Sequence, residues 1–291
     1  MLYSTSNLDK ENSNPYIFEE VKTPVGKKSL NNDNKNTFLL ANTKPWANKH
    51  LPFPKDYKFE PLRSDDVWIL GHPKSGSTWT ENIVWQLKNG FDFSEEPLAL
   101  KTSPILERET KPLVDNIEAG NKDVEFLNNA LSPRVILSHL PPNLLPIELW
   151  TIRPKIIYSA RTMEEYFDIF LDNRTIYAPF HVHILANWQL RNLDHFLFLN
   201  YEEQLTDQFG AVQRNAKFLE CTYGEDELKQ LMEYSSIENM RKLYNKPLNG
   251  FQFFRNGKAG EFADVMSEEY IKKFDEWTAA HLKGSDFKFA I

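Results

Sequence analysis

The feature that most constrains how this chain can fold is a glycine- and serine-rich loop between a short apolar run and a helical pattern. Residues 66–72, DVWILGH, form an apolar run that a Gly/Pro/Ser cluster ends, which favours a buried strand. Residues 78–88 then place apolar side chains at helical spacing, at Trp79, Ile83, Val84 and Leu87. We therefore expect a strand, a tight loop and a helix in direct succession.

Three further apolar runs predict strands, at residues 134–140, 155–160 and 195–201. Helices are expected between and after them, near residues 163–173, 206–219, 225–233, 236–244 and 267–282. Short apolar strands that alternate with helices are typical of an α/β fold whose parallel sheet is covered on both faces. Ligands of such sheets bind beyond the carboxyl ends of the strands, so we expect the functional residues there.

The composition narrows the class of protein. The chain has 291 residues, of which 41% are hydrophobic, and this is enough for a large buried core. Its net charge of -7 argues against a nucleic-acid partner, because phosphate contacts need clustered cations. The single cysteine, Cys221, excludes an intramolecular disulfide and a Cys-rich zinc site.

Two further observations concern the location of the protein. No run approaches the roughly 18 apolar residues of a membrane span, so no membrane partner is expected. The first residues have neither the basic nor the apolar part of a secretory signal, which favours a cytoplasmic location. Residues 1–50 are polar with scattered prolines, and we expect them to form a partly mobile arm.

The loop at residues 71–79, GHPKSGSTW, has what a bound phosphate requires: converging backbone N–H groups, a helix N-terminus and a cation. Gly76 permits a tight turn and Lys74 supplies the charge, while Ser77 and Thr78 add hydroxyl donors. The pattern is close to the NTPase loop G-x-x-x-x-G-K-[ST], but Ser77 stands where the lysine belongs. This weakens an NTPase or kinase interpretation. A turn without a ligand is the other alternative.

The segment PKSGSTW resembles the 5′-phosphosulfate loop of the cytosolic sulfotransferases. The resemblance continues in the family's order through RVILSHLPP, KIIYSART, FLFLNYEEQ, SSIENMRKL and FFRNGKAGEF, and the C-terminal MSEEYIKKFDEW looks most like the insect branch. It implies one α/β domain over residues 51–291, following the arm of residues 1–50. It also implies transfer of a sulfonate group from 3′-phosphoadenosine 5′-phosphosulfate (PAPS) to a hydroxyl or amine, without a metal.

The resemblance assigns the contacts of this co-substrate residue by residue. For the 5′-phosphosulfate it implies Lys74, Ser75, Gly76, Ser77 and Thr78. For the adenine side it implies Trp79, Tyr201, Ser235, Ile237 and Met240. For the 3′-phosphate it implies Arg161, Arg255, Asn256 and Gly257. Trp79 also fits a core aromatic residue that opens a helix, and this alternative stays open.

His139 is the candidate general base, because it follows a predicted strand and precedes Leu140-Pro141-Pro142 at the expected cleft. A lone histidine is more often structural, but the resemblance favours a catalytic role. A neutral imidazole would take the proton of the acceptor hydroxyl, and Lys74 would stabilise charge on the departing phosphate. The expected acceptor is a small apolar alcohol or phenol. His181 and His183 lack the partners of a metal site, so no role is expected for them.

Three departures from the family pattern leave alternatives open. Leu137 replaces a lysine near the sulfonate, and Ile169 replaces a serine that donates to the 3′-phosphate. The region 170–180, beside the acceptor pocket in the family, is shortened. The chain is therefore either an active transferase, a nucleotide-binding paralogue with little or no transfer activity, or a dehydratase-like relative that uses the same co-substrate. The family's short dimer motif is not retained, so the resemblance implies no dimer.

Overall fold

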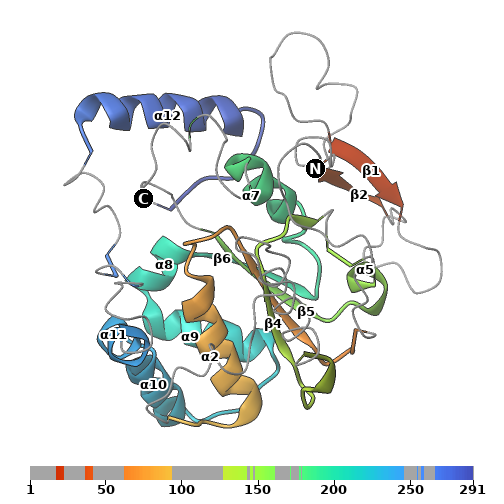
Figure 1. Ribbon diagram of the computed structural model, residues 1–291, viewed down its shortest axis with the longest axis vertical. Helices are drawn as coiled ribbons and strands as arrows, with labels where there is room; N and C mark the ends of the chain where they lie inside the picture. The colour runs from red at the N-terminus through yellow and green to blue at the C-terminus, as the bar shows by residue number, and fades with distance from the viewer. Residues whose placement is uncertain are drawn as a thin grey trace, which may run out of the picture.

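The computed structural model describes residues 18–22, 37–41, 62–93, 127–142, 145–146, 148–160, 171, 177, 179–245, 254, 257–258 and 266–290. At its centre lies a four-stranded sheet (Figure 1) made of β3 (Val67–Gly71), β4 (Val135–Ser138), β5 (Lys155–Ala160) and β6 (Phe196–Asn200). The strands lie in the order β4-β3-β5-β6, and every neighbouring pair is parallel. The parallel sheet is confirmed, and each strand lies within the apolar run that predicts it.

Helices follow the strands, at α2 (Ser77–Asn89), α5 (Leu149–Ile152), α7 (Phe180–Trp188), α8 (Tyr201–Thr206), α9 (Gln208–Phe218), α10 (Glu225–Tyr234), α11 (Ile237–Asn245) and α12 (Glu268–Leu282). The helix predicted at 206–219 is found as α9, which begins after Asp207 because Asp207 caps it by accepting from the Gly210 backbone N–H at 2.9 Å. The sequence patterns do not predict α5, α7 or α8. Of the helix predicted at 163–173, the structure describes only Leu171, which is helical.

The N-terminal region contributes a separate pair of strands. β1 (Phe18–Lys22) and β2 (Thr37–Ala41) pair antiparallel, and they fall within the predicted arm. The boundary of that arm at residue 50 stays a prediction. Among the described residues, no helix is both long and apolar enough to cross a membrane.

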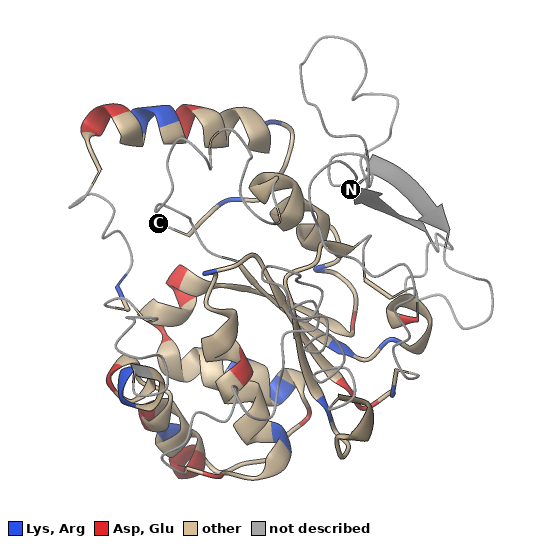
Figure 2. Ribbon diagram, viewed as in Figure 1, with Lys and Arg blue, Asp and Glu red and all other residues tan. Residues whose placement is uncertain are grey.

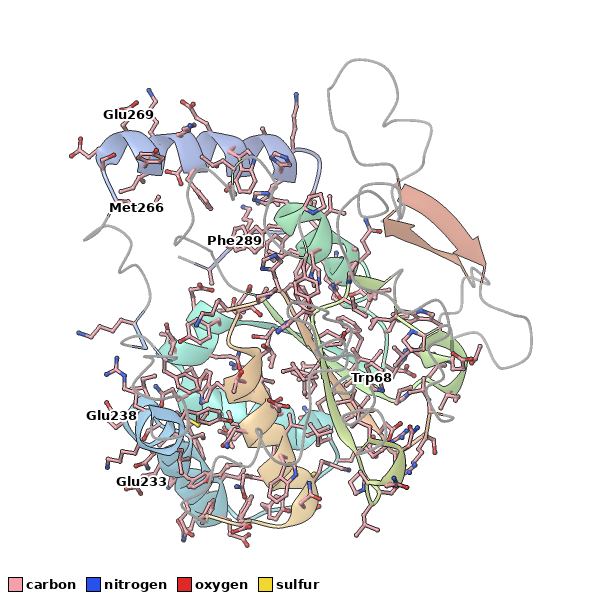
Figure 3. The ribbon with its side chains drawn as sticks, viewed as in Figure 1. Trp68, Glu233, Glu238, Met266, Glu269 and Phe289 are labelled. Carbon is pink, nitrogen blue, oxygen red and sulfur yellow. The ribbon has the colours of Figure 1, made fainter. Side chains whose placement is uncertain are left out.

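The sheet is buried because each of its faces is covered by helices. Successive residues of β3 enter opposite core clusters: Ile69 packs beneath α2, α9, α10 and α11, whereas Trp68 packs beneath α5 and α7. Both side chains are fully buried, and Trp68 is labelled in Figure 3. Glu233 and Glu269 point outward from their helices in the same view. Strands buried on both faces read as continuous apolar runs, which is why the sequence predicts them well.

Helix α7 is an apolar covering helix. It contains no Lys, Arg, Asp or Glu, and it is uncoloured throughout in Figure 2, whereas α10, α11 and α12 carry charges of both signs. Seven of its residues are buried, among them His181 and His183. Helix α12 lies over α7, and the Trp277 ring packs against His181 with 4.3 Å between ring centroids. This explains why α7 has no charged face.

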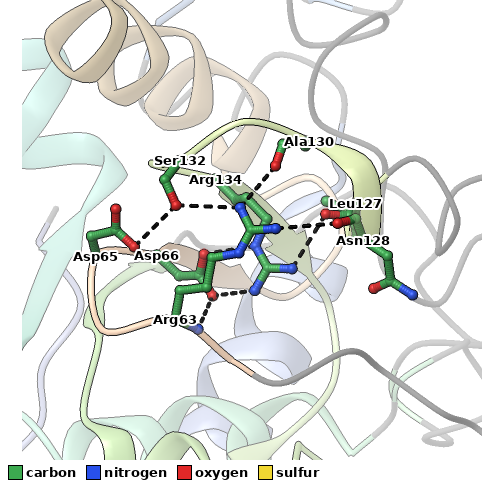
Figure 4. A network of polar contacts seen from close by, with 8 residues as sticks. All are labelled: Arg63, Asp65, Asp66, Leu127, Asn128, Ala130, Ser132 and Arg134. Carbon is green, nitrogen blue, oxygen red and sulfur yellow. Dashed lines mark hydrogen bonds and ion pairs between the residues drawn. The ribbon is translucent and has the colours of Figure 1, made fainter.

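A buried ion pair joins the two residues that precede β3 and β4. Asp66 accepts from Nε and Nη2 of Arg134 at 2.7 and 2.6 Å, and both side chains are fully buried (Figure 4). The remaining polar atoms are also satisfied: the Arg63 backbone N–H donates to Asp66 at 2.8 Å, and Arg134 Nη1 donates to the Leu127 carbonyl at 3.2 Å. The pair therefore fixes how β3 and β4 start beside each other.

We predict that Arg134→Met destabilises the fold by about 3–5 kcal/mol, because it leaves the Asp66 carboxylate buried without its partner. Urea unfolding followed by circular dichroism measures this loss. Arg214→Met is the matched control, since Arg214 pairs with Asp207 at 3.3 Å on an exposed helix surface. Equal unfolding midpoints for Arg134→Met and the wild type would contradict this account of the pair.

Candidate active site

The candidate site lies at the carboxyl ends of β3 and β4. The ladder between these strands pairs Val67 with Val135 and continues to Leu70 with Ser138. One step further the same register places Gly71 beside His139, and the His139 ring contacts the Gly71 carbonyl at 2.6 Å. The phosphate-type loop begins directly after Gly71. The structure thus brings the loop and the candidate base together, as the sequence predicts.

The loop after β3 has a fixed and partly strained backbone. Lys74 and Gly76 both have left-handed conformations, with φ of 69° and 86°. The Ser75 backbone N–H donates to the His72 carbonyl at 3.1 Å, and the Ser75 carbonyl accepts from the Ser159 hydroxyl on β5. A left-handed lysine costs about 1–2 kcal/mol relative to a helical one, and such strain is typical of functional loops. The Lys74 side chain is exposed.

The N-terminus of α2 suits an anion. No side chain caps this terminus, and its first turn contains no acidic residue. The Ser75 hydroxyl just before it is fully buried and has no hydrogen-bond partner. Backbone N–H groups at a helix start carry partial positive charge and bind phosphate without further support. Together with Lys74, these donors fit a phosphate or phosphosulfate group.

Three predicted adenine-side residues come together at the first turn of α2. The Trp79 indole N–H donates to the Ser235 carbonyl at 2.8 Å. The Trp79 and Tyr201 rings meet edge to face, with 6.0 Å between centroids. Trp79 is only 8% exposed and belongs to the core cluster, so it also fits the core-aromatic interpretation. The Ser235 hydroxyl donates to the Leu231 carbonyl, which leaves only its oxygen to accept from a ligand.

The remaining adenine-side residues lie on α11. Met240 is buried in the same core cluster as Trp79. Gly257 has a φ of 65°, and a Cβ atom there would stand 2.9 Å from Cγ1 of Ile237. The structure therefore brings the segment around Gly257 against the start of α11. Four other residues singled out from the sequence lie outside the described residues: Arg161, Ile169, Arg255 and Asn256.

The His139 ring has a defined tautomer. Its Nδ1 lies 2.6 Å from the Gly71 carbonyl oxygen, and a carbonyl can only accept a hydrogen bond. Nδ1 therefore carries the proton, and Nε2 is the basic nitrogen of the neutral ring. The ring is half-buried, and the Tyr177 ring lies 5.6 Å away between centroids. A proton-accepting nitrogen beside a phosphate-type loop is what general-base chemistry requires.

Sequence reasoning missed the residues that support His139. His183 Nε2 lies 2.9 Å from the His139 carbonyl, and His183 Nδ1 lies 3.0 Å from the Tyr158 hydroxyl. The sequence gives no metal-type partner for His183, and its polar contacts come from distant segments. The only available signal was a histidine pair within an otherwise apolar stretch, 178–188.

Leu137 has a packing role that its position in the family pattern does not reveal. It is 2% exposed and lies in the core cluster with Trp79 and Ile83. A lysine with the same orientation would enter this apolar cluster. In the described part of the chain, no group of three His, Cys, Asp or Glu side chains is placed to share a metal ion.

The comparison with known families identifies the family of the chain. A sequence model of the sulfotransferase domain matches residues 64–163 and 159–286. These ranges cover well over half of the chain, so the protein belongs to the sulfotransferase family and is a sulfotransferase enzyme by class.

Individual relatives are more distant. The chain is 27% identical over 288 residues to luciferin sulfotransferase of the insect Photinus pyralis. This alignment covers 82% of this chain and 77% of the relative. It is 29% identical over 265 residues to cytosolic sulfotransferase 13 of Arabidopsis thaliana, covering 78% and 80% of the two chains. The insect relative supports the resemblance to the insect branch.

Solved structures share the fold. Retinol dehydratase in complex with androsterone and the inactive cofactor PAP superposes with a TM-score of 0.70 at 22% identity, covering 79% of this chain and 84% of that one. Mouse sulfotransferase SULT7A1 complexed with PAP superposes with a TM-score of 0.60 at 19% identity, covering 77% of this chain and 87% of that one. The protein therefore has the single α/β domain of these enzymes, as predicted.

We predict that Gly76→Ala destabilises the protein more than Gly90→Ala. Both glycines have positive φ, at 86° and 71°, so the backbone strain of alanine is present at both. A Cβ at position 76 would stand 2.4 Å from Cδ2 of Tyr201, whereas nothing lies within 4 Å at position 90. Thermal unfolding of both variants measures the difference. Equal melting temperatures would show that the Tyr201 ring does not hold the loop.

Proposed function

We propose that the protein transfers a sulfonate group from PAPS to a hydroxyl of a small apolar acceptor. The observation that carries this proposal is the contact between His139 and Gly71, which places a basic nitrogen next to a phosphate-type loop. The family match supports the reaction class. Two solved relatives, retinol dehydratase and mouse sulfotransferase SULT7A1, are complexes with PAP, the desulfonated form of the co-substrate, and they support its binding here.

In this proposal, the co-substrate is held at both ends. The loop from Lys74 to Thr78 and the N-terminus of α2 bind the 5′-phosphosulfate. Trp79, Tyr201, Ser235, Ile237 and Met240 enclose the adenine. Arg161, Arg255, Asn256 and Gly257 bind the 3′-phosphate. The close packing of Trp79, Tyr201 and Gly76 supports a common site for the first two groups.

His139 acts as the general base. Its Nε2 accepts the hydroxyl proton while the acceptor oxygen forms a bond to sulfur. The bond between sulfur and the 5′-phosphate oxygen breaks, and that oxygen keeps the electron pair. Lys74 and the N–H groups at the start of α2 stabilise the charge that develops on it. The products are a sulfate ester and adenosine 3′,5′-bisphosphate. The proton is on Nε2 of His139 at the end of this step.

The acceptor is proposed to be a small apolar alcohol or phenol. One relative is a luciferin sulfotransferase, and retinol dehydratase has been solved with retinol and with androsterone, all of which are small molecules. The aromatic ring of Tyr177 lies beside the His139 ring, and the apolar helix α7 contacts His139 through His183. Both suit such a molecule. A cytoplasmic location is part of the proposal, because two of the relatives are cytosolic sulfotransferases.

The direct test is incubation with labelled PAPS and a panel of phenols, sterols and retinoids. Transfer of the label to one acceptor supports the proposal. Binding of PAP without transfer to any acceptor would favour a nucleotide-binding paralogue, and a dehydrated product would favour a dehydratase.

We predict that His139→Ala lowers turnover by about 10²–10⁴-fold, the usual contribution of a positioned base. Its affinity for PAP should barely change, because the imidazole faces the acceptor. Lys74→Ala should lower both PAP affinity and turnover, since the lysine contacts the group that is held and the group that leaves. Steady-state kinetics and calorimetry measure the two effects, with Lys88→Ala at the other end of α2 as the control. Wild-type turnover in His139→Ala would refute the base.

We also predict that the reaction needs no added metal, since lysine and backbone donors can stabilise the departing phosphate. This expectation is motivated by the lysine, which stands within the loop at position 74 and not at position 77, where an NTPase loop has it. Turnover after treatment with EDTA should equal that of the untreated protein. Activity that disappears with EDTA and returns with Mg²⁺ would move the assignment toward phosphoryl transfer.

A further inference from the structure

Two histidines of α7 are buried in an apolar environment but differ in their contacts. His181 is 1% exposed and His183 is fully buried. Neither ring nitrogen of His181 has a hydrogen-bond partner, and its ring packs against Trp277 and His281. Both ring nitrogens of His183 are hydrogen-bonded. This difference makes His181 an internal reference for the role of His183.

The contacts of His183 form a directed chain across three elements. The His139 carbonyl can only accept, so His183 Nε2–H donates to it across 2.9 Å. His183 Nδ1 is then unprotonated and accepts from the Tyr158 hydroxyl across 3.0 Å. The chain therefore runs from Tyr158 on β5 through His183 on α7 to the main chain at the end of β4.

The protonation states keep this direction constant. Burial lowers the pKa of His183 to about 4, so the ring is neutral near pH 7. Burial also raises the pKa of Tyr158 well above its usual value, so its hydroxyl remains a donor. Both groups thus keep their roles over the range in which the proposed reaction takes place.

His139 is consequently held at two points. Its ring donates to the Gly71 carbonyl, and its own carbonyl accepts from His183. The first contact sets the tautomer of the ring, and the second restrains the main chain from which the ring extends. A base that is misplaced by about 1 Å can lose on the order of 10²-fold in rate.

We propose that His183 is a positioning residue for the reaction: with Tyr158 behind it, it holds the main chain of His139 so that Nε2 meets the acceptor hydroxyl. This inference rests on the proposed function, in which His139 is the base. His183 itself does not touch the reacting atoms in this account. It acts through the His139 carbonyl.

Three variants separate positioning from simple packing. His183→Leu removes both hydrogen bonds and should lower kcat by about 10- to 100-fold, with KM for PAPS changed by less than about twofold. His183→Gln supplies an amide N–H donor and a carbonyl acceptor, so it should recover most of the lost kcat. His181→Leu changes an equally buried residue of the same helix and should keep kcat within about threefold of the wild type. The acceptor is the one that gives the highest wild-type rate in the panel above.

If the wild type transfers sulfonate, three outcomes would overturn the inference. They are a wild-type kcat in His183→Leu, an equal loss of kcat in His181→Leu, and no recovery in His183→Gln. A wild type without transfer would instead refute the proposed function. The His139 ring then still reports on positioning through its ¹⁵N signals. A released main chain would also loosen the bond between the His139 ring and Gly71, so His183→Leu should mix the two neutral tautomers of His139. Retention of a single tautomer would overturn the inference.

Discussion

The register between β3 and β4 is the constraint on which the site depends. Asp66 and Arg134 are 68 positions apart and form a fully buried, doubly hydrogen-bonded ion pair where the two strands begin. Gly71 and His139 are also 68 positions apart and meet where the strands end. A shift of one residue would turn each side chain of β4 to the other face and separate the base from the loop. The ion pair at one end of the strands therefore helps to fix the contact between Gly71 and His139 at the other end.

The carboxyl ends of the strands share a second feature. Side chains from neighbouring segments donate hydrogen bonds to backbone carbonyl groups there. His139 donates to Gly71, Ser159 donates to Ser75, and His183 donates to His139. Each bond satisfies a backbone acceptor that the sheet no longer pairs. Together they hold the loop and the base to the same rigid sheet. Strain at Lys74 can persist in such surroundings, and the donors at the start of α2 are aligned before a ligand arrives.

Local patterns predict much of this architecture. The four central strands are buried on both faces, and their apolar runs therefore mark them in the sequence. The sequence also predicts that the loop from Lys74 to Thr78 and His139, the proposed base, lie directly after two of these strands. The match with the sulfotransferase domain confirms the family to which the same segments point.

Other parts depend on tertiary contacts that no local pattern contains. Helix α7 has no polar face because α12 covers it, and no side chain caps its start at Pro179. The proposed role of His183 depends on its hydrogen bonds to Tyr158 and His139, which lie 25 and 44 positions away. Leu137 stands where the family has a cation, yet it fills the core beneath α2. The sequence shows the substitution at this position but not the packing that it serves.

The central claim is that the strand register brings a basic nitrogen of His139 to face the phosphate-type loop. A crystal structure of the protein with PAP and an acceptor alcohol or phenol tests it most directly. The account predicts that the N–H groups at the start of α2 bind the 5′-phosphate of PAP. It also predicts that the acceptor hydroxyl lies about 2.6–3.2 Å from Nε2 of His139, with Nδ1 still bonded to Gly71. An acceptor hydroxyl that contacts a different base, or a His139 ring turned away from the phosphate, would contradict it.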